Sequence, residues 1–391
     1  MGSGQLRRAR GALRTHGLGT TIFAEMSALA TATRSVNLGQ GFPDSDGPEE
    51  VVDAAIEAIR AGMNQYPPGP GIPELREAVA HHRQRFTGLA YDPDTEVLVT
   101  TGATEAIAAA LLGLVDPGDE VVVLEPYYDS YVACIGFAGA LRRPVTLRPP
   151  TYDLDVDELR DVVTNRTRLL LLNTPHNPTG AVLSREELEA VAALAVERDL
   201  VVVVDEVYEH MTYERPHVAA ATLPGMRERT LSFGSAGKTF SMTGWKIGWV
   251  TGPADLVAAV RTVKQFLTYT SGAPFQPAVA RGLRLPDEYF TGLASTLRGK
   301  RDRLCAGLAG LGLEVHVPRG TYFATTDVRP LGYASGLDFC RELPGRAGVV
   351  AIPHAVFWDD QEIGGPLVRW AFCKADLVLD EAVARLATAF G

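Results

Sequence analysis

The chain has 391 residues and a formal net charge of −10 at pH 7, with 46% hydrophobic and 21% charged residues. This length suits two compact domains, and this composition is typical of a soluble globular protein rather than a disordered or fibrous one. The acidic balance, with no basic run longer than RRAR (7–10), excludes nucleic acid from the expected partners.

The first 19 residues form a Gly/Arg-rich leader, which we expect to be frayed. The leader lacks the apolar centre of a secretion signal, and no apolar stretch of the chain reaches the length of a membrane span. The four cysteines (134, 305, 340 and 373) are scattered and show no spacing typical of metal ligands. We therefore predict isolated buried thiols, no metal site, no membrane contact and a reducing, cytoplasmic compartment.

Helical and strand patterns alternate from about residue 48 onward. Helical spacing of apolar residues covers 49–62, 72–86, 104–115 and 184–199, the last with Ser184 as its N-cap. Strand patterns cover 96–101, 120–126, 168–175, 200–208, 230–236 and 246–252. Because the runs LLLL (169–172) and VVVV (201–204) are apolar without alternation, their strands should be covered on both faces. The pattern predicts an α/β fold with a largely parallel, doubly wound sheet.

Polar and special residues gather where these strands end, in TTGAT (100–104), EPYYDSY (125–131), NTPHNPTG (173–180), DEVYEH (205–210) and SFGSAGK (232–238). Ligands of such sheets bind at the carboxyl ends of the strands. We therefore expect the functional site at this edge of the sheet.

The composition changes after a long helical region at about 285–311. The segments EVHVPRGTYFATTDV, GVVAIPHAVFW and LVRWAFCK indicate shorter strands mixed with helices. We predict a large domain at 48–294, a smaller α+β domain at 295–391, and an N-terminal segment at 1–47 that joins the smaller domain.

The segment SFGSAGKTFSMTGWKIGW (232–249) contains GKT, which resembles the end of a phosphate-binding P-loop. A P-loop requires G-x-x-x-x-G-K-[ST] followed by a helix. Here Ser232 stands where the first glycine is needed, and Gly244 and Gly248 make the following residues poor helix formers. No dinucleotide-binding G-x-G-x-x-G opens a helix after a strand either. Both kinds of phosphate loop are therefore rejected.

Two lysines of this segment, Lys238 and Lys246, suit a different chemistry. An ε-amine forms an imine with an aldehyde cofactor if desolvation or a nearby cation lowers its pKa, and Lys246 would be such a cation for Lys238. The pattern S-x-x-K-x-x-x-x-x-G-x-K-x-G (235–248) resembles the lysine region of fold-type I pyridoxal-phosphate (PLP) enzymes, specifically class I/II aminotransferases. Two ordinary surface lysines are the alternative, but they leave the surrounding small residues unexplained.

A PLP site also needs a buried carboxylate that keeps the ring nitrogen protonated, and Asp205 at the end of a strand suits that task. The phenol of Tyr208 and the amide of Asn177 would donate hydrogen bonds to the ring oxygen. Alone, Asp205 reads equally well as a turn residue, and Asn177 as part of an Asn-Pro turn.

The phosphate needs backbone N–H groups at a helix N-terminus, which the TTGATEAI segment provides at Gly102, Ala103 and Thr104. Ser235 and Lys246 would complete this cup. The residue that stacks on the cofactor ring in the resembled family corresponds to Tyr128, although an aromatic pair after a strand is more often core packing.

The resemblance extends over nearly the whole chain through seven motifs in order: VNLGQGFPD, NQYPPGPG, NTPHNPTG, DEVYEH, SAGKTFSMTGWKIGW, GTYF and VRWAFCK. Within the class I/II aminotransferases, it points to the group of N-succinyldiaminopimelate aminotransferases and kynurenine–oxoglutarate (glutamine) transaminases. It implies the PLP-transferase fold of type I, with a mainly parallel seven-stranded sheet in the large domain.

Four further residues take their roles from the resemblance alone. Arg369 matches the arginine that binds the substrate α-carboxylate with a bidentate fork. Gly41 matches a backbone position that touches the same carboxylate, and Phe23 matches an aromatic wall of the substrate pocket. Tyr66 matches a tyrosine that reaches the phosphate of a neighbouring subunit, which implies a homodimer with shared active sites.

The resemblance implies a transaminase that moves the α-amino group of an amino acid to a 2-oxo acid, through a Lys238 internal aldimine and pyridoxamine phosphate. Lys238 would then act as the general base. Because a scaffold does not determine a reaction, β-lyase chemistry and γ-elimination or replacement on an S-adenosylmethionine-like substrate stay open, as does a PLP-binding regulator. The amino donor is not predicted, since no residue is singled out as the extra cation that a succinylated diaminopimelate would need.

Overall fold

The computed structural model describes residues 12–15, 19 and 21–391, beginning with the short 3-10 helix η1 (Leu13–Thr15). The RRAR run at 7–10 and most of the predicted frayed leader lie outside the described residues. Within the described ranges, no helix combines the length and the apolar character that a membrane span requires.

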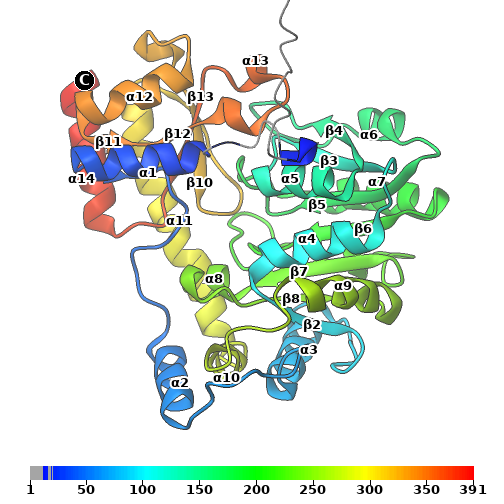
Figure 1. Cartoon of the computed structure of the whole chain (residues 1–391). Helices are drawn as coiled ribbons and strands as arrows, with labels where there is room; N and C mark the ends of the chain where they lie inside the picture. The colour runs from blue at the N-terminus through cyan, green and yellow to red at the C-terminus, as the bar shows by residue number, and fades with distance from the viewer. Residues whose placement is uncertain (1–11, 16–18, 20) are drawn as a thin grey trace, which may run out of the picture.

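A seven-stranded sheet forms the centre of the larger part of the molecule (Figure 1). Its strands, in spatial order, are β2 (Val97–Thr100), β8 (Gly248–Thr251), β7 (Thr230–Ser235), β6 (Val201–Asp205), β5 (Thr167–Asn173), β3 (Glu120–Glu125) and β4 (Leu141–Thr146). Neighbouring strands are parallel except at β8, which runs antiparallel to both β2 and β7. The predicted α/β class and the mainly parallel sheet are confirmed.

Apolar side chains fill both faces of this sheet, because successive residues of a strand point to opposite sides. Val121 and Val123 of β3 belong to one buried cluster, whereas Val122 and Leu124 belong to another. The first cluster includes α4 (Gly102–Leu114), α5 (Asp129–Ala138) and α9 (Ala254–Leu267). The second includes α6 (Val156–Val162) and α7 (Arg185–Glu197). Helix α7 begins at the predicted cap, since Ser184 forms a capping box with Glu187.

A third cluster packs against the β2 and β8 edge of the sheet and includes the helices α2 (Glu49–Arg60), α3 (Pro73–Thr87) and α10 (Phe275–Gly282). Short elements complete this part of the chain: η2 (Ala220–Thr222), α8 (Ala236–Thr239) and η3 (Thr243–Trp245). Helix α8 has only four residues, in agreement with the poor helix-forming sequence after Lys238.

The C-terminal part contains an antiparallel four-stranded sheet in the order β12 (Ile352–Pro353), β13 (Leu367–Ala371), β10 (Phe323–Asp327) and β9 (Glu314–His316). Its helices are α11 (Asp287–Gly310), α12 (Gly336–Ala347), α13 (Gln361–Gly364), α14 (Asp376–Phe390), η4 (Arg329–Leu331) and η5 (His354–Phe357). In Figure 1, α11 runs from the region of α10 toward α1 and α14.

The N-terminal segment contacts this C-terminal part. Helix α1 (Ile22–Thr33) packs beside α12, and β1 (Val36–Asn37) pairs in parallel with β11 (Val349–Val350) (Figure 1). The division into 1–47, 48–294 and 295–391 stays a prediction, and we propose it as the domain organisation.

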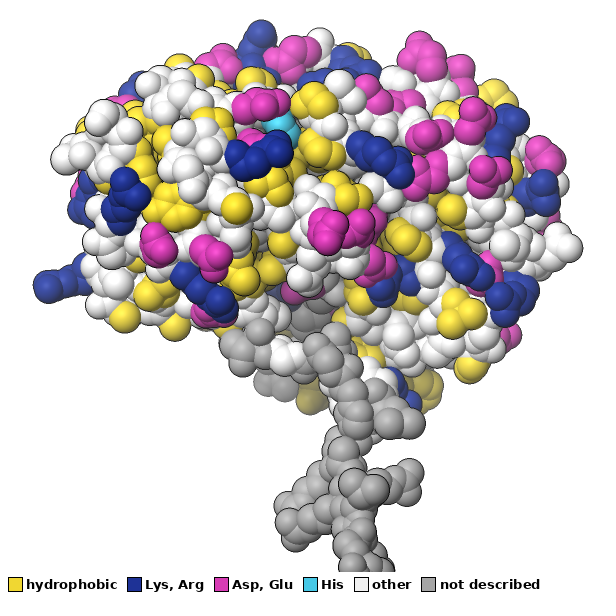
Figure 2. Space-filling view, turned by 90° about the horizontal axis from the view of Figure 1, so that it is seen from above, with side chains coloured by type: hydrophobic (Ala, Val, Ile, Leu, Met, Phe, Trp, Pro, Cys, Tyr) yellow, Lys and Arg dark blue, Asp and Glu magenta, His cyan; other side chains and the backbone are white. Residues whose placement is uncertain are grey.

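Charged side chains of both signs are interspersed over the face seen from above in Figure 2, with hydrophobic side chains between them. No broad patch of one charge covers the described part of that face.

Candidate active site

A cavity of about 510 Å³ lies at the carboxyl ends of the central parallel strands. Its walls come from the central sheet, the N-terminal segment and the C-terminal part. The structure brings thirteen of the predicted residues together here: Phe23, Gly41, Gly102, Ala103, Thr104, Tyr128, Asn177, Asp205, Tyr208, Ser235, Lys238, Lys246 and Arg369. Tyr66 is the exception, since it does not line the cavity and its side chain is 84% exposed.

Lys238 enters the cavity from α8, directly after β7. Its Nζ donates a hydrogen bond to the hydroxyl of Tyr322 at 2.8 Å and lies 3.5 Å from the carbonyl oxygen of Gly41. The Tyr322 hydroxyl donates in turn to the same carbonyl at 2.7 Å. These contacts link the lysine to the Gly41 segment and hold its amine at one place.

Burial is the main reason that the pKa of Lys238 falls from its usual value to about 8. The positive charges of Arg369 and then Lys246 lower this pKa further, whereas Asp205 raises it. Both predicted causes, desolvation and the nearby cation Lys246, therefore lower this pKa, and desolvation is the larger. Near pH 8 about half of the amine is neutral and able to act as a nucleophile or base.

Asp205 ends β6 and is buried. Its carboxylate accepts a hydrogen bond from the Tyr131 hydroxyl at 2.7 Å and from the backbone N–H of Val207 at 3.3 Å. Burial raises its pKa to about 6, although these two bonds and the charge of Lys238 oppose the shift. A buried carboxylate of this kind gains free energy from a cationic partner in the cavity.

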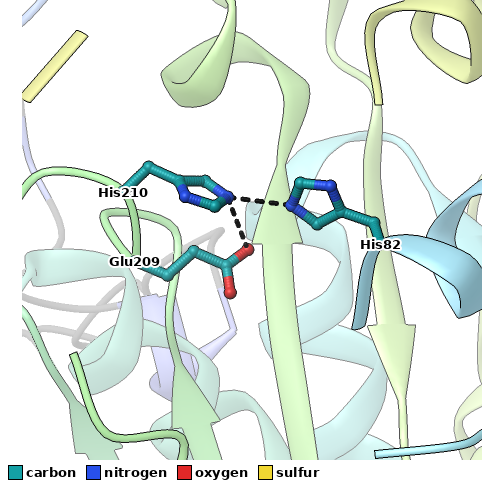
Figure 3. Close-up of side chains that lie close together, drawn as sticks. All are labelled: His82, Glu209 and His210. Atoms are coloured by element: carbon teal, nitrogen blue, oxygen red, sulfur yellow. Dashed lines mark hydrogen bonds and ion pairs between the residues drawn. The ribbon is translucent and has the colours of Figure 1, made fainter. Parts of the chain in front are cut away.

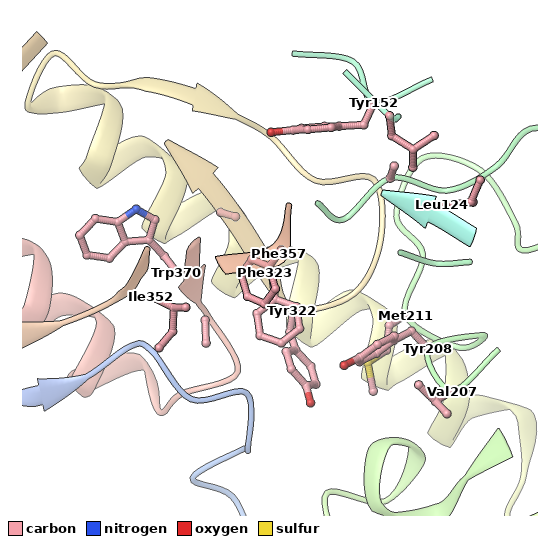
Figure 4. Close-up of a cluster of buried hydrophobic side chains, with 14 of the residues drawn as sticks. Leu124, Tyr152, Val207, Tyr208, Met211, Tyr322, Phe323, Ile352, Phe357 and Trp370 are labelled. Carbon is pink, nitrogen blue, oxygen red and sulfur yellow. The ribbon is translucent and has the colours of Figure 1, made fainter. Parts of the chain in front are cut away.

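Two tyrosines near these residues were not predicted. Tyr131 lies in the EPYYDSY segment, three residues after Tyr128, and its ring packs edge-on against Tyr128 at 5.6 Å. Tyr322 lies in the GTYF motif and faces Tyr208 across 5.3 Å (Figure 4). Both tyrosines stand in motifs that the sequence analysis singles out. Their contacts with Asp205 and Lys238 are not predictable from the motifs, because these partners are far away in sequence.

Arg369 projects from β13 and is 2% exposed. Its Nη1 donates to Asn177 Oδ1 at 2.9 Å and its Nη2 to the carbonyl oxygen of Gly39 at 3.0 Å, whereas its buried Nε has no partner among the described residues. Its guanidinium lies over Phe323, 4.0 Å from the ring centroid, with Phe23 at 5.2 Å. Burial lowers its pKa to about 10, so the group stays charged at neutral pH.

The N-terminus of α4 presents backbone N–H groups to the cavity. Its N-cap, Thr101, makes no side-chain capping bond, and the first N–H groups of the helix line the cavity without a side-chain partner among residues 12–15, 19 and 21–391. Lys246 Nζ lies 3.4 Å from the Thr104 hydroxyl, and Ser235 lines the same side. Gly248 permits this approach, because a Cβ there would lie 2.7 Å from the carbonyl carbon of Gly102. Together these groups suit a multiply charged anion.

Comparison with known proteins identifies the family. The sequence model described as "Aminotransferase class I and II" matches residues 33–364. The chain belongs to the class I and II aminotransferases.

This aminotransferase is similar to relatives whose names give different amino donors. It is 54% identical to the probable N-succinyldiaminopimelate aminotransferase DapC of Mycobacterium tuberculosis, over 94% of this chain and 95% of that protein. The solved structure of that N-succinyldiaminopimelate aminotransferase superposes with a TM-score of 0.95, covering 97% of this chain and 100% of the other. The methionine aminotransferase of Escherichia coli is 40% identical (94% and 96% covered), and a kynurenine–oxoglutarate transaminase of Dictyostelium discoideum is 37% identical (94% and 94%).

This aminotransferase is therefore an enzyme of the transaminase type, with an amino acid and a 2-oxo acid as substrates and PLP as its cofactor. The predicted family, fold class, activity and cofactor are confirmed. The residues present fit the cofactor, because the cavity joins a buried carboxylate, an amine of lowered pKa and an uncapped helix N-terminus beside a lysine.

Proposed function

We propose that the cavity is the active site for amino transfer and that Lys238 is its covalent attachment point and its base. The observation that carries this proposal is the position of the Lys238 amine, whose pKa is about 8, in a cavity that also holds Asp205 and Arg369. PLP, when bound, supplies an aldehyde that condenses with amines and a ring that withdraws electrons from the substrate α-carbon.

The residues around the cavity divide the task of holding the cofactor. Asp205 would accept the hydrogen bond of the ring nitrogen, with its carboxylate oriented by Tyr131. Tyr208 and Asn177 would donate to the ring oxygen, and Tyr128 would cover one face of the ring. The phosphate would bind the N-terminus of α4 (at Gly102, Ala103 and Thr104), Ser235 and Lys246.

Arg369 would bind the substrate carboxylate, since its buried Nε has no other partner in the described part of the chain and its fork suits two carboxylate oxygens. Gly41, which lines the cavity, would touch the same carboxylate through its backbone, and Phe23 would form an aromatic wall of the substrate pocket. The neutral Nζ of Lys238 would take the proton from the substrate α-carbon and later return it. Tyr322 would position that Nζ through its hydrogen bond.

We propose an amino donor with an uncharged, largely apolar side chain. The described lining contains only three cations, Lys238, Lys246 and Arg369, each of which already has a role, and it includes the acidic residue Asp129. A second substrate carboxylate would therefore lack a free cation, whereas Phe23 and Phe323 suit an apolar chain. This supports a methionine-like donor over a succinylated diaminopimelate.

Initial rates with a panel of amino donors and 2-oxoglutarate test this choice. We expect kcat/KM for methionine to exceed that for N-succinyldiaminopimelate by at least about tenfold, since an unpaired charge costs more than 1.4 kcal/mol. The reverse order would refute the apolar-donor proposal while leaving amino transfer intact.

We also propose a homodimer in which Tyr66 reaches the phosphate of the second subunit. Tyr66 is 84% exposed, and its ring packs against that of Tyr269 with centroids 5.8 Å apart. Phe266, three residues before Tyr269, is 81% exposed. Large exposed aromatics of this kind support an interface. Light scattering should give twice the chain mass of 42.0 kDa, and a monomer of full activity would refute the shared site.

A cytoplasmic location is proposed as well, supported by four buried cysteines that are all unpaired. Fractionation of the source cells, followed by detection with an antibody to this chain, should find the protein in the cytoplasmic fraction. Its presence mainly in another fraction would refute the proposal.

Because β8 lies close to the N-terminus of α4, a single methyl group added at Gly248 should have a strong effect on PLP binding. Gly248→Ala would place a Cβ 2.7 Å from the carbonyl carbon of Gly102 and 2.8 Å from the N of Ala103. The helix N-terminus must then move, and we expect PLP to bind at least about tenfold more weakly, because the phosphate cup is distorted. Gly244→Ala is the matched control, since its added Cβ meets no atom within 4 Å. Equilibrium dialysis should separate the two variants, and equal affinities would contradict the role of this contact.

Covalent capture of PLP by the apoprotein should depend on pH in a defined direction. Burial lowers the pKa of Lys238 to about 8. The fraction of the amine that is neutral and reactive therefore rises with pH and is close to one at about one pH unit above this pKa. We expect the capture rate to rise and then level off above about pH 9, whereas an ordinary lysine would keep gaining to about pH 10.4. Stopped-flow absorbance of the cofactor measures this rate. A tenfold rise per unit that continues past pH 9 would show an unperturbed amine.

A further inference from the structure

A second cluster of chemically active side chains lies outside the cavity. His82 on α3 faces Glu209 and His210, which follow β6 (Figure 3). The Nε2 atoms of the two histidines are 2.8 Å apart, and His210 Nε2 lies 3.9 Å from Glu209 Oε1. All three potential ligand atoms lie within 4.8 Å of one another, and none of the three residues lines the cavity.

These separations are close to those of a metal site. A four-coordinate ion with bonds of about 2.0–2.1 Å spaces its ligand atoms about 3.3 Å apart. The two histidine nitrogens would therefore have to move apart by about 0.5 Å, and the Glu209 oxygen would have to approach by about as much. The third pair of ligand atoms, on His82 and Glu209, lies within 4.8 Å.

The outer contacts orient two of the three groups, His82 and Glu209, as ligands. His82 Nδ1 lies 3.4 Å from the carbonyl oxygen of Leu283, so a proton on Nδ1 leaves the lone pair on Nε2. The second oxygen of Glu209 accepts a hydrogen bond from Arg83 Nη1 at 2.8 Å, which leaves Oε1 facing His210.

The charge around the cluster leaves room for a cation. Arg83 bridges Glu209 and Glu206, with its Nη2 2.9 Å from the latter, so two buried carboxylates share one guanidinium. His217 contacts Glu206 on its other side at 3.1 Å. The two carboxylates, when ionised, and the Arg83 guanidinium sum to one net negative charge, and Arg85 farther out is paired with Asp287. This negative charge would partly balance a divalent ion.

Aromatic rings hold the two imidazoles in place. Phe86 packs against His82 with ring centroids 4.6 Å apart, and Phe290 packs against His210 at 4.6 Å. Such an apolar shell limits water around a metal site and strengthens its electrostatic interactions. The side chain of His210 is 10% exposed, so the cluster lies close to solvent.

We propose that His82 Nε2, His210 Nε2 and Glu209 Oε1 bind one divalent transition-metal ion of the Zn²⁺ type. Two imidazoles and one carboxylate favour zinc over magnesium or calcium, which prefer all-oxygen ligands. The ion joins α3 to the loop that follows Asp205 and carries Tyr208, and thereby stiffens that loop. The proposal is independent of the roles assigned in the cavity. It revises the prediction of no metal site, which considered only ligand spacing along the sequence.

The test is zinc binding by the tag-free, PLP-loaded protein after treatment with a chelating resin. Zinc retained through gel filtration, measured by mass spectrometry of the metal, is expected at one ion per chain, and a Zn²⁺ titration should raise the melting temperature. His82→Gln and, separately, His210→Gln should each weaken binding by at least about 30-fold, since each removes one of three ligands.

His81→Gln is the matched control, because His81 is the neighbouring histidine on the same helix and is exposed. It should retain zinc as the unaltered chain does. Melting in the presence of chelator shows whether each variant is folded, and His210→Gln, at the edge of the cluster, covers the case in which His82→Gln does not fold. Failure of the unaltered protein to retain zinc, or equal retention by the His81 and His210 variants, would overturn the proposal.

Discussion

Lys238→Ala is expected to lower kcat for amino transfer by at least about 10⁴-fold, because one amine supplies both the covalent attachment and the base. Lys246, the other lysine of the cavity lining, does not take its place, because its Nζ lies at the α4 N-terminus, 3.4 Å from the Thr104 hydroxyl. PLP should still bind to the variant, but without a covalent bond.

Lys246→Ala provides the comparison for this result. We expect it to weaken PLP binding and yet to leave measurable turnover at saturating cofactor, because it removes a phosphate contact and only a minor influence on the pKa of Lys238. Borohydride reduction followed by peptide mass spectrometry locates the covalent bond. A cofactor-modified peptide in the Lys238→Ala protein, or a modified Lys246 in the unaltered protein, would show that the wrong lysine has been assigned.

Arg369→Lys is expected to lower kcat/KM for the amino donor by roughly 30- to 1000-fold, corresponding to a loss of about 2–4 kcal/mol at a buried charged contact. The positive charge is retained, but the planar fork is not, and lysine cannot span both Asn177 and a carboxylate from the same depth. The loss should fall mainly on KM, because the carboxylate is bound before and during proton transfer.

Arg341→Lys is the matched control, since Arg341 is half-exposed and its Nε donates only to Glu25. It should change kcat/KM by less than about twofold. Amines without a carboxylate distinguish a lost carboxylate contact from a general loss of activity. They should react equally slowly with the unaltered enzyme and with Arg369→Lys. A variant that keeps full kcat/KM for amino acids would exclude Arg369 as the carboxylate-binding residue.

The central sheet is predictable because its strands are strongly patterned. The apolar runs of β5 and β6 indicate burial on both faces, and both strands are buried there. The direction of β8 is not predictable, because KIGWVTG is equally apolar whichever way it runs. Strand β4 (LRRPVT) is missed, since an edge strand with one solvated side, a proline and two arginines has no clear pattern.

The cavity residues are predictable only where they lie at strand ends. Asp205, Asn177 and Lys238 all follow apolar strands, so topology alone brings them to one edge. Tyr131 and Tyr322 are missed as contacts because their partners lie 74 and 84 residues away in sequence. The role of Arg369 came only from the family resemblance, since its partner Asn177 is 192 residues away.

The most direct test of amino transfer at this site is a single half-reaction. The PLP-loaded protein, mixed with an amino donor and no acceptor, should release one equivalent of 2-oxo acid per chain and then stop, retaining the amino group on the bound cofactor. Added 2-oxoglutarate should restart turnover. Continuous product release without an acceptor, or release of ammonia, would contradict the account and indicate an elimination reaction instead.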